Sequence, residues 1–356
     1  MNFLTPGPSQ LYFTVETHIK SALKNDICAI SHRSKAFQQV IGHTIAQIRQ
    51  LMNVPDDYYI TFTASATEIW ERILQNLSAE YSYHLVNGSF SKKFYDFAVS
   101  LKRNASKHEV ALGQCFDLNS FTVPSQTEVL CLTHNETSTG VSMPLSDIYE
   151  LRKQHPDKLI ALDMVSSAPY PDLDFRHIDT AFFSVQKCFG LPAGLGVWIF
   201  NEKCLEKSLA LEKAGMSTGT YHTISSLVKN IRTNETPETP NMLGIYLLGK
   251  VCEDMNNRGI GAIRNETNYK AALMYHTIQQ GENFKAFVEN EKFRSKTVIV
   301  ADVIKPKASF FINKFKEHQI TVGSGYGAGK DTQIRIANFP THSKETFELL
   351  AELMSK

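Results

Sequence analysis

One stretch, from residue 180 to residue 196, decides the fold. It reads Thr180-Ala181-Phe182-Phe183-Ser184-Val185-Gln186-Lys187-Cys188-Phe189-Gly190-Leu191-Pro192-Ala193-Gly194-Leu195-Gly196. The apolar start predicts a buried strand, and the Gly and Pro residues after Lys187 predict a turn. A second apolar run, residues 196–200, predicts the next strand. Lys187 is therefore expected at the mouth of a strand–turn–strand unit, where desolvation would lower the pKa of its amine and make it nucleophilic near neutral pH.

Two upstream strands are expected to deliver polar residues to the same place. Residues 159–163 form an apolar run that ends in Asp163, and residues 129–133 form another that is followed by the polar run 134–140. Ligands bind at the carboxyl ends of the strands in open α/β sheets. A lysine that can form a Schiff base and a carboxylate nearby are the two protein groups that pyridoxal phosphate needs most. Pyridoxal phosphate is thus the cofactor that the residues favour.

Composition excludes several other classes of function. The 356 residues include 37 basic and 36 acidic side chains, a formal net charge of +1, so no bulk field favours nucleic acid or an anionic membrane. The six cysteines are scattered, with no CxxC pair and no zinc spacing, so no metal site is expected. The N-terminus lacks the features of a signal peptide, and no apolar run approaches the roughly 20 residues of a membrane span. A cytoplasmic protein is expected.

Strands alternate with helices up to about residue 200, which predicts a mostly parallel sheet covered by helices on both faces. The strand at 58–62 runs through the small residues 63–67 into a helix, a possible phosphate cradle. The Thr/Pro-rich residues 217–240 are expected to form a loop. We predict a large domain over 14–245 and a smaller α+β domain over 246–356, with residues 1–13 packing near the active site.

The glycine-rich run 323–329 is only superficially like a nucleotide-binding loop and is expected to be a mobile linking loop. A dinucleotide fingerprint follows a strand and opens a helix, whereas this run leads into the apolar residues 334–337. No GxGxxG follows the first strand either, which disfavours a Rossmann dehydrogenase. A non-catalytic binding protein of the same fold is a further alternative, and the presence of both Lys187 and Asp163 argues against it.

Several short motifs, in their order and spacing, resemble those of the class V aminotransferases, which are fold-type I pyridoxal-phosphate enzymes. The resemblance covers essentially the whole chain and rests on Thr5-Pro6-Gly7-Pro8, Ser31-His32-Arg33-Ser34, Leu51-Met52-Asn53-Val54-Pro55, Asn135-Glu136-Thr137, Asp163 with Ser166-Ser167, Gln186-Lys187 with Pro192-Ala193-Gly194-Leu195, and Arg335. It implies an α/β large domain with a mostly parallel sheet and a smaller C-terminal α+β domain.

The resemblance also implies a role for each candidate site residue. Lys187 would form the Schiff base and move a proton, and Asp163 would pair with the pyridinium nitrogen. Phe90 would stack on the cofactor ring, while Thr137 would bond near its phenolic oxygen or phosphate. Ala66, Thr67 and Gln186 would hold the cofactor phosphate. Thr239 would be donated by the neighbouring subunit of a homodimer with shared active sites. His32, Arg33 and Arg335 would bind the substrate.

Each candidate has a structural alternative. Asp163 is also suited to capping a helix that follows it, Phe90 to a place in the core, and Arg335 to an ordinary ion pair. His32 is also suited to be a structural histidine with its hydrogen bonds satisfied, or a helix-entry residue.

Within the family, the motifs resemble those of two substrate classes. Residues 51–55 and 335–338 favour the phosphoserine enzymes, which exchange an amino group between phosphoserine and 2-oxoglutarate in serine biosynthesis. Residues 134–140 and 163–167 resemble those of alanine–glyoxylate and serine–glyoxylate enzymes as much as they resemble those of the phosphoserine enzymes. A second His-Arg pair, usual before the late arginine strand of the phosphoserine enzymes, is missing here. Lys330 offers a point charge at that place but not a bidentate fork.

Overall fold

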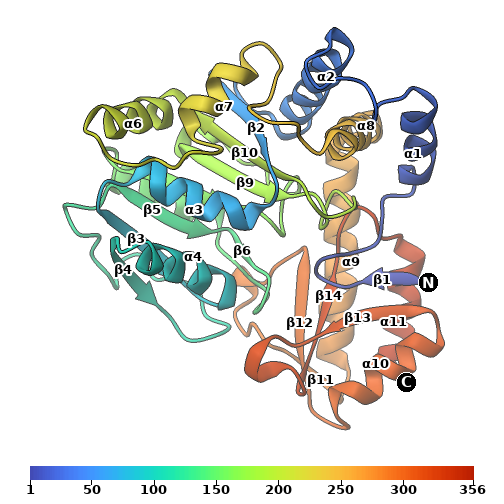
Figure 1. Cartoon of the computed structure of the whole chain (residues 1–356). Helices are drawn as coiled ribbons and strands as arrows, with labels where there is room; N and C mark the ends of the chain where they lie inside the picture. Colours follow the sequence, from blue (N-terminus) through green and yellow to red (C-terminus); the bar gives the residue numbers. More distant parts are fainter.

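Two β-sheets organise the chain, a seven-stranded sheet in the larger part and a five-stranded sheet in the smaller part (Figure 1). The computed structural model describes residues 1–356. The larger sheet has the order β2-β10-β9-β8-β5-β3-β4. Its strands are β2 (Tyr58–Thr63), β3 (Tyr81–Val86), β4 (Asn104–Glu109), β5 (Val129–Thr133), β8 (Leu159–Asp163), β9 (Thr180–Ser184) and β10 (Gly196–Asn201). Only β10 runs antiparallel to its neighbours, so the prediction of a mostly parallel sheet is confirmed.

Helices cover both faces of the larger sheet, as Figure 1 shows. The helices are α1 (Val15–Lys24), α2 (Lys35–Met52), α3 (Ala66–Leu77), α4 (Ser89–Ser100), α5 (Leu145–Gln154), α6 (Glu202–Lys213), α7 (Ile224–Ile231), α8 (Met242–Arg258), α9 (Ile260–Gln280), α10 (Ala308–Glu317) and α11 (Lys344–Ser355). Neighbouring strand residues point to opposite faces. Phe182 therefore packs with α3, α4, α6 and α7, whereas Phe183 packs with α2, α5 and α8. Burying each ring contributes about 1.5–3 kcal/mol.

The smaller sheet has the order β1-β13-β14-β12-β11. Its strands are β1 (Asn2–Leu4), β11 (Phe284–Ala286), β12 (Val298–Val303), β13 (Ile320–Ser324) and β14 (Gln333–Ala337). Helices α9, α10 and α11 pack against it around a separate apolar core. β1 comes from the other end of the chain and pairs in parallel with β13, with Asn2 opposite Ile320. A short hairpin, β6 (Asn135–Glu136) with β7 (Val141–Ser142), completes the strands.

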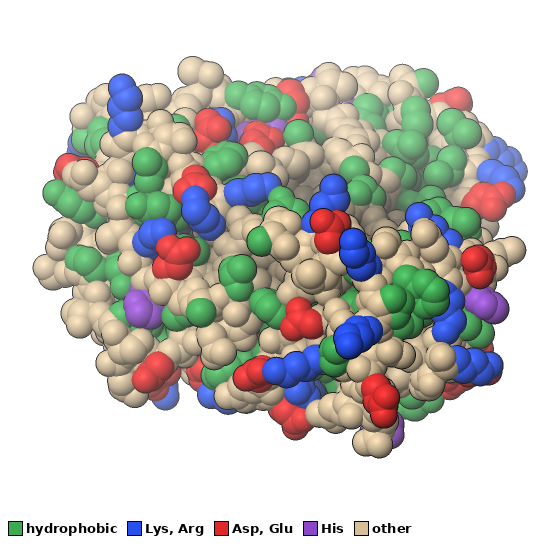
Figure 2. Space-filling model, turned by 90° about the horizontal axis from the view of Figure 1, so that it is seen from below, with side chains coloured by type: hydrophobic (Ala, Val, Ile, Leu, Met, Phe, Trp, Pro, Cys, Tyr) green, Lys and Arg blue, Asp and Glu red, His purple; other side chains and the backbone are tan.

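The predicted domain boundary at residue 245 falls inside α8 (Met242–Arg258), whose apolar face packs in the core of the larger sheet. The division of the chain at this residue stays a prediction. No helix of this chain has both the length and the apolar composition needed to cross a membrane. On the face drawn in Figure 2, acidic and basic side chains lie interspersed, in keeping with the net charge of +1.

The expectation of a loop over residues 217–240 is wrong in its middle third, where the chain forms α7 (Ile224–Ile231). The side chain of Thr223 caps this helix by accepting a hydrogen bond from the Ser226 amide. Its buried residues, Ile224, Leu227, Val228 and Ile231, follow the spacing of one helix face. Two turns of helix between long polar flanks give too short a periodic pattern to stand out in the sequence.

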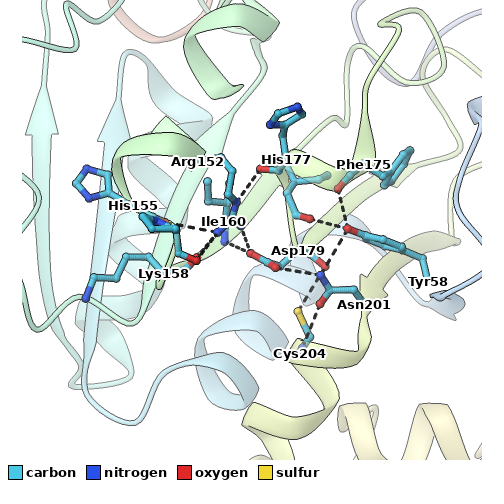
Figure 3. A network of polar contacts seen from close by, with 12 residues as sticks. Tyr58, Arg152, His155, Lys158, Ile160, Phe175, His177, Asp179, Asn201 and Cys204 are labelled. Carbon is cyan, nitrogen blue, oxygen red and sulfur yellow. Dashed lines mark hydrogen bonds and ion pairs between the residues drawn. The ribbon is translucent and has the colours of Figure 1, made fainter. Parts of the chain in front are cut away.

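A buried polar network around Asp179 ties the strands together at the edge opposite their carboxyl ends (Figure 3). The Asp179 carboxylate pairs with the Arg152 guanidinium and accepts hydrogen bonds from the Ile160 amide, at 2.8 Å, and from Asn201 Nδ2, at 2.9 Å. Tyr58 donates to the carbonyl oxygen of Ile178 at 2.7 Å. One carboxylate thus links α5, β8 and β10 just before β9 begins.

Replacing this carboxylate by an amide is expected to lower the free energy of unfolding. Asp179→Asn leaves the guanidinium of Arg152 buried without its counter-charge, a change that costs about 3 kcal/mol in comparable buried pairs. Denaturant unfolding of the variant and the parent chain measures the difference. Asp174→Asn is the matched control, because Asp174 pairs with the exposed Arg176, and its effect is expected to be far smaller. Equal effects of the two substitutions would show that the network is not stabilising.

Candidate active site

A cavity of about 210 Å³ lies at the carboxyl ends of β5, β8 and β9. It brings together eight of the eleven predicted site residues: Ala66, Thr67, Phe90, Thr137, Asp163, Gln186, Lys187 and Arg335. The other lining residues are Pro6, Gly7, Trp70, Thr133, Asn135, Val165, Ser184 and Tyr326. The prediction that these strand ends meet is confirmed by this placement, because the sheet order puts β8 between β5 and β9.

Lys187 lies in the turn between β9 and β10 and is only 7% exposed. Its Nζ donates a hydrogen bond to Thr137 Oγ1 at 2.9 Å and lies 5.1 Å from the centre of the Phe90 ring. Burial lowers the pKa of this amine to about 8, although the negative charge of Asp163 opposes the shift. A substantial fraction of the amine is therefore neutral near physiological pH and able to act as a nucleophile or base.

Asp163 ends β8 and is buried on the floor of the cavity. Burial raises the pKa of its carboxyl group to about 6, opposed by hydrogen bonds from the Val165 amide, at 2.9 Å, and from Trp70 Nε1, at 3.0 Å. No helix begins directly after Asp163, so it does not serve as the helix cap that was its structural alternative. Each carboxylate oxygen is held by one donor, which fixes the orientation of the group.

The turn between β2 and α3 faces the same cavity. Ser65 caps α3, and the amide of Ala66 donates to Ser184 Oγ at 2.8 Å, which holds the turn against the end of β9. Gly196 permits this close approach, because a Cβ there would lie 2.5 Å from the carbonyl carbon of Ser65. The start of α3 thus presents the positive end of its dipole to the cavity, an arrangement that favours an anion.

Phe90 is placed by the start of α4. Glu136 accepts hydrogen bonds from the amides of Phe90, at 3.1 Å, and Ser91, at 2.9 Å, and so caps this helix from β6. Gly88 is required beside it, since a Cβ there would overlap the Glu136 side chain. The ring of Phe90 is partly buried and lines the cavity, which is not the fully buried core position considered as its alternative.

Arg335 projects from β14 of the smaller sheet and forms no ion pair within the chain, so the alternative of an ordinary ion pair is wrong. Its Nε donates to the Ser324 carbonyl oxygen at 2.8 Å, and its Nη1 donates to the Thr137 carbonyl oxygen at 3.3 Å. The guanidinium carbon lies 5.3 Å from the centre of the Tyr326 ring. A partly buried guanidinium with no carboxylate partner is suited to bind an anionic ligand.

The N-terminal segment supplies one wall of the cavity. Gly7 adopts a φ of +117° beside Lys187, and a Cβ at this position would lie 2.8 Å from Lys187 Cε. The amide of Ser9 then donates to the Gln186 carbonyl oxygen at 3.1 Å. The segment after β1 is therefore held directly against the turn that carries the reactive amine.

Three predicted site residues lie outside the cavity of their own chain and next to one another. Arg33 pairs with Glu235, with Nη1 2.7 Å from Oε2, and donates to the Pro237 carbonyl oxygen at 3.2 Å. His32 Nδ1 lies 3.2 Å from Thr239 Oγ1. The entry to α2 and the loop before α8 thus form one polar patch, which does not line the cavity of this chain.

The sequence-based prediction assigned no role to several residues that line or support the site, and three of them stand out. Trp70 orients Asp163 from α3, Glu136 fixes the start of α4, and Tyr326 lines the cavity from the glycine-rich run expected to be only a linking loop. Glu136 stands within a quoted motif, and its capping bond needed the position of α4 to be recognised. Trp70 lies one turn into α3, where its apolar spacing favours an ordinary core position. These contacts join residues far apart in the sequence.

Comparison with known proteins agrees with this geometry. Residues 104–336 match the family model of the class-V aminotransferases. The chain belongs to this family. As an aminotransferase it acts on small amino acids and 2-oxo acids, and the predicted fold-type I architecture is confirmed.

Solved and curated relatives of this aminotransferase are similar over most of their length. A phosphoserine aminotransferase from Cytophaga hutchinsonii is 50% identical, with a TM-score of 0.97 over 99% of this chain and 97% of the other. A phosphoserine aminotransferase from Rhodococcus jostii is 25% identical over 348 residues, 97% of this chain and 90% of the relative. A phosphoserine aminotransferase from Trichomonas vaginalis with bound pyridoxal phosphate, 18% identical, shares the fold with a TM-score of 0.84, over 99% of each chain.

Proposed function

We propose that this aminotransferase uses pyridoxal phosphate, held at Lys187, to move an amino group between phosphoserine and 2-oxoglutarate. The observation that carries the proposal is the position of the Lys187 amine and the Asp163 carboxylate in one buried cavity, beside the helix start at Ala66 and Thr67. An amine, a carboxylate and an anion-binding turn are the three contacts that a phosphorylated pyridine aldehyde requires.

The residues of the cavity fit this cofactor. Thr133 Oγ1 is buried in the lining without a hydrogen-bond partner, as expected of a group kept for a bound ligand. When bound, pyridoxal phosphate supplies the electron sink that allows a proton to leave the Cα of an amino acid. The carboxylate of Asp163 would hold a positive pyridine nitrogen, and the ring of Phe90 would cover one face. The amine of Lys187, once free, would move the proton at Cα.

Arg335 supports an amino-acid substrate in the same cavity. Its guanidinium has no partner carboxylate in the chain, so it is available to bind a substrate carboxylate through two parallel hydrogen bonds. The choice of phosphoserine is supported by the half-identical enzyme of Cytophaga hutchinsonii, which carries that name. His32 and Arg33 would then bind the substrate phosphate.

The polar patch of His32, Arg33 and Thr239 supports a homodimer with shared active sites. These residues lie together and away from the cavity of their own chain. We infer that each subunit presents the patch to the cavity of its partner, where Thr239 would contact the cofactor and Arg33 the substrate. The proposal also includes small-molecule substrates and a cytoplasmic location. It includes no nucleic-acid partner and no membrane partner.

A second candidate is a class-V aminotransferase of the alanine–glyoxylate, serine–glyoxylate or pyruvate type. It is favoured by the loop before β14, which lacks a His-Arg pair and carries only Lys330, a residue that does not line the cavity. An unphosphorylated amino donor would need no second cationic contact at this place.

Half-reactions distinguish the two candidates. The holoenzyme is mixed separately with phosphoserine, serine and alanine, and the conversion of the cofactor to its amine form is followed by its absorption. Phosphoserine is expected to convert the cofactor fastest at equal concentration. Faster conversion by alanine or serine would overturn the phosphoserine assignment while leaving the proposed cofactor intact. No change with any amino acid would contradict aminotransfer itself.

The uptake of the cofactor is expected to depend on pH. Only the neutral amine of Lys187 attacks an aldehyde, and burial lowers the pKa of this amine to about 8. The rate at which the cofactor-free chain takes up pyridoxal phosphate should therefore rise with pH and reach half its maximum near pH 8. Stopped-flow absorbance measures this rate. A half-maximum near 10.5, the ordinary lysine value, would mean that the amine is not desolvated.

A further inference from the structure

A buried histidine, His222, joins two carboxylates beside the start of α3. Its side chain is 2% exposed, and its Nδ1 lies 2.6 Å from Glu68 Oε1 while its Nε2 lies 3.1 Å from Glu238 Oε1. The ring of Tyr221 stacks on the imidazole at a centroid distance of 3.8 Å. His222 is absent from the cavity lining and belongs to none of the motifs by which the family was recognised.

Glu68 places a negative charge next to the turn that would hold the cofactor phosphate. It is the third residue of α3, directly after Ala66 and Thr67, and its Oε2 accepts a hydrogen bond from the Ala64 amide at 3.0 Å. The carboxylate thus braces the turn, but a phosphate bound at the same helix start would carry close to two negative charges. Like charges on the same turn repel, and partial burial strengthens the repulsion.

The surroundings of His222 keep it protonated. Burial opposes the charge, but the hydrogen bond to Glu68 and the neighbouring carboxylates of Glu238 and Glu68 prevail and raise the pKa of His222 to about 9. Burial also disfavours the charged form of Glu68, and the hydrogen bond and charge of His222 outweigh it and lower the pKa of this carboxyl group. The other charged or titratable groups facing this cluster are Arg72 of α3, which donates to the Tyr221 carbonyl oxygen at 3.1 Å, and the Tyr221 phenol.

We propose that His222 is a positioning residue for the phosphate of the cofactor. Its imidazolium neutralises Glu68 and ties the Ala64–Thr67 turn to the loop that carries Thr239. This inference rests on the proposed binding of pyridoxal phosphate in the cavity and adds a residue to it. With His222 in place, Glu68 braces the turn without repelling the anion. Without the imidazolium, the same carboxylate opposes a phosphate monoester but not a neutral ligand.

The test compares two ligands that differ only in the phosphate. The dissociation constants of pyridoxal phosphate and of pyridoxal are measured by absorbance for the full chain freed of cofactor, for His222→Gln and for Glu68→Gln/His222→Gln. His222→Gln is expected to weaken binding of pyridoxal phosphate about tenfold and to leave binding of pyridoxal unchanged. The double variant is expected to regain most of the lost affinity, because the repelling carboxylate is gone.

The matched control is His43→Gln, since His43 of α2 also faces a glutamate, Glu253, with Nε2 3.4 Å from Oε2, away from the cavity. It should change neither dissociation constant. An equal loss for both ligands in His222→Gln, no loss at all, or no recovery in the double variant would overturn the proposal.

Wild-type chain gives an independent readout that needs no folded variant at position 222. Both ligands bind at Lys187, so the titration of its amine changes both affinities equally. It therefore cancels in the ratio of the affinities for pyridoxal phosphate and pyridoxal. This ratio is expected to fall about tenfold as pH rises through about 9, the pKa of His222, because deprotonation leaves Glu68 unneutralised. A flat ratio would overturn the proposal. If the wild type bound neither ligand, the proposed cofactor would itself be wrong, and the role of His222 would be rejected with it.

Discussion

Lys187→Ala is expected to lower the turnover of the aminotransferase by about 10⁴-fold, the upper end of what a positioned acid–base group contributes. The reason is the geometry around this amine, which is buried, has a pKa of about 8 and is aimed at Thr137 and Phe90. No other lysine lines the cavity, so none can replace it. Steady-state turnover with phosphoserine and 2-oxoglutarate measures the loss.

Lys92→Ala is the matched control, because Lys92 is exposed on α4 and pairs with Asp96 at 2.8 Å. Its turnover should equal that of the parent chain. A complementary experiment reduces the holoenzyme with borohydride and maps the labelled peptide, which should contain position 187. A label at another lysine, or a Lys187→Ala variant that keeps its activity, would refute the assignment of the reactive amine.

Asp163→Asn is expected to lower kcat/KM by about 10²- to 10³-fold, the loss typical of one group aimed at a charge that matters in the transition state. The amide keeps the size of the side chain but not the negative charge that would hold a positive pyridine nitrogen. In the parent chain the Val165 amide and Trp70 Nε1 stabilise that charge against burial. Kinetics together with the pH dependence of the cofactor absorption measure the change.

Asp179→Asn is the internal control for this prediction. Both aspartates are buried, but Asp163 ends β8 and lines the cavity, whereas Asp179 directly precedes β9 and does not line it. Replacing Asp179 should lower the free energy of unfolding and leave the turnover of folded molecules unchanged. Asp163→Asn should lower turnover and leave the free energy of unfolding unchanged. Loss of stability without loss of turnover in Asp163→Asn would remove this residue from the chemistry.

The central part of the fold follows from local patterns in the sequence. The apolar run 181–183, the turn at Lys187 and the run that ends in Asp163 are each short and continuous, so their strands and the meeting of their ends were predictable. The large-sheet helices with clear 3.6-residue spacing, such as α2 (Lys35–Met52), were predictable for the same reason. Hydrophobic periodicity shows where each strand or helix begins and ends. The residues that follow the strands can therefore be placed at one edge of the sheet.

Contacts between distant elements could not be predicted in this way. No pattern near Trp70 indicates that its indole reaches Asp163, and none near Glu136 indicates that it caps α4. The polar flanks of α7 (Ile224–Ile231) hid two turns of helix. Tyr326 looked like part of a linking loop because glycines surround it. Such residues become visible only when the fold brings their partners within reach.

The pairing of β1 with β13 has a consequence for the synthesis of the chain. Residues 2–4 are translated long before their partners, residues 320–322. A nascent chain must therefore keep this segment unpaired until residues 320–322 have been translated, and such a long-range contact slows folding. Gly7, which follows β1 and touches Lys187, reaches its final place at the same late moment. Polypeptides released early by the ribosome would contain the lysine and the aspartate but lack a finished pocket.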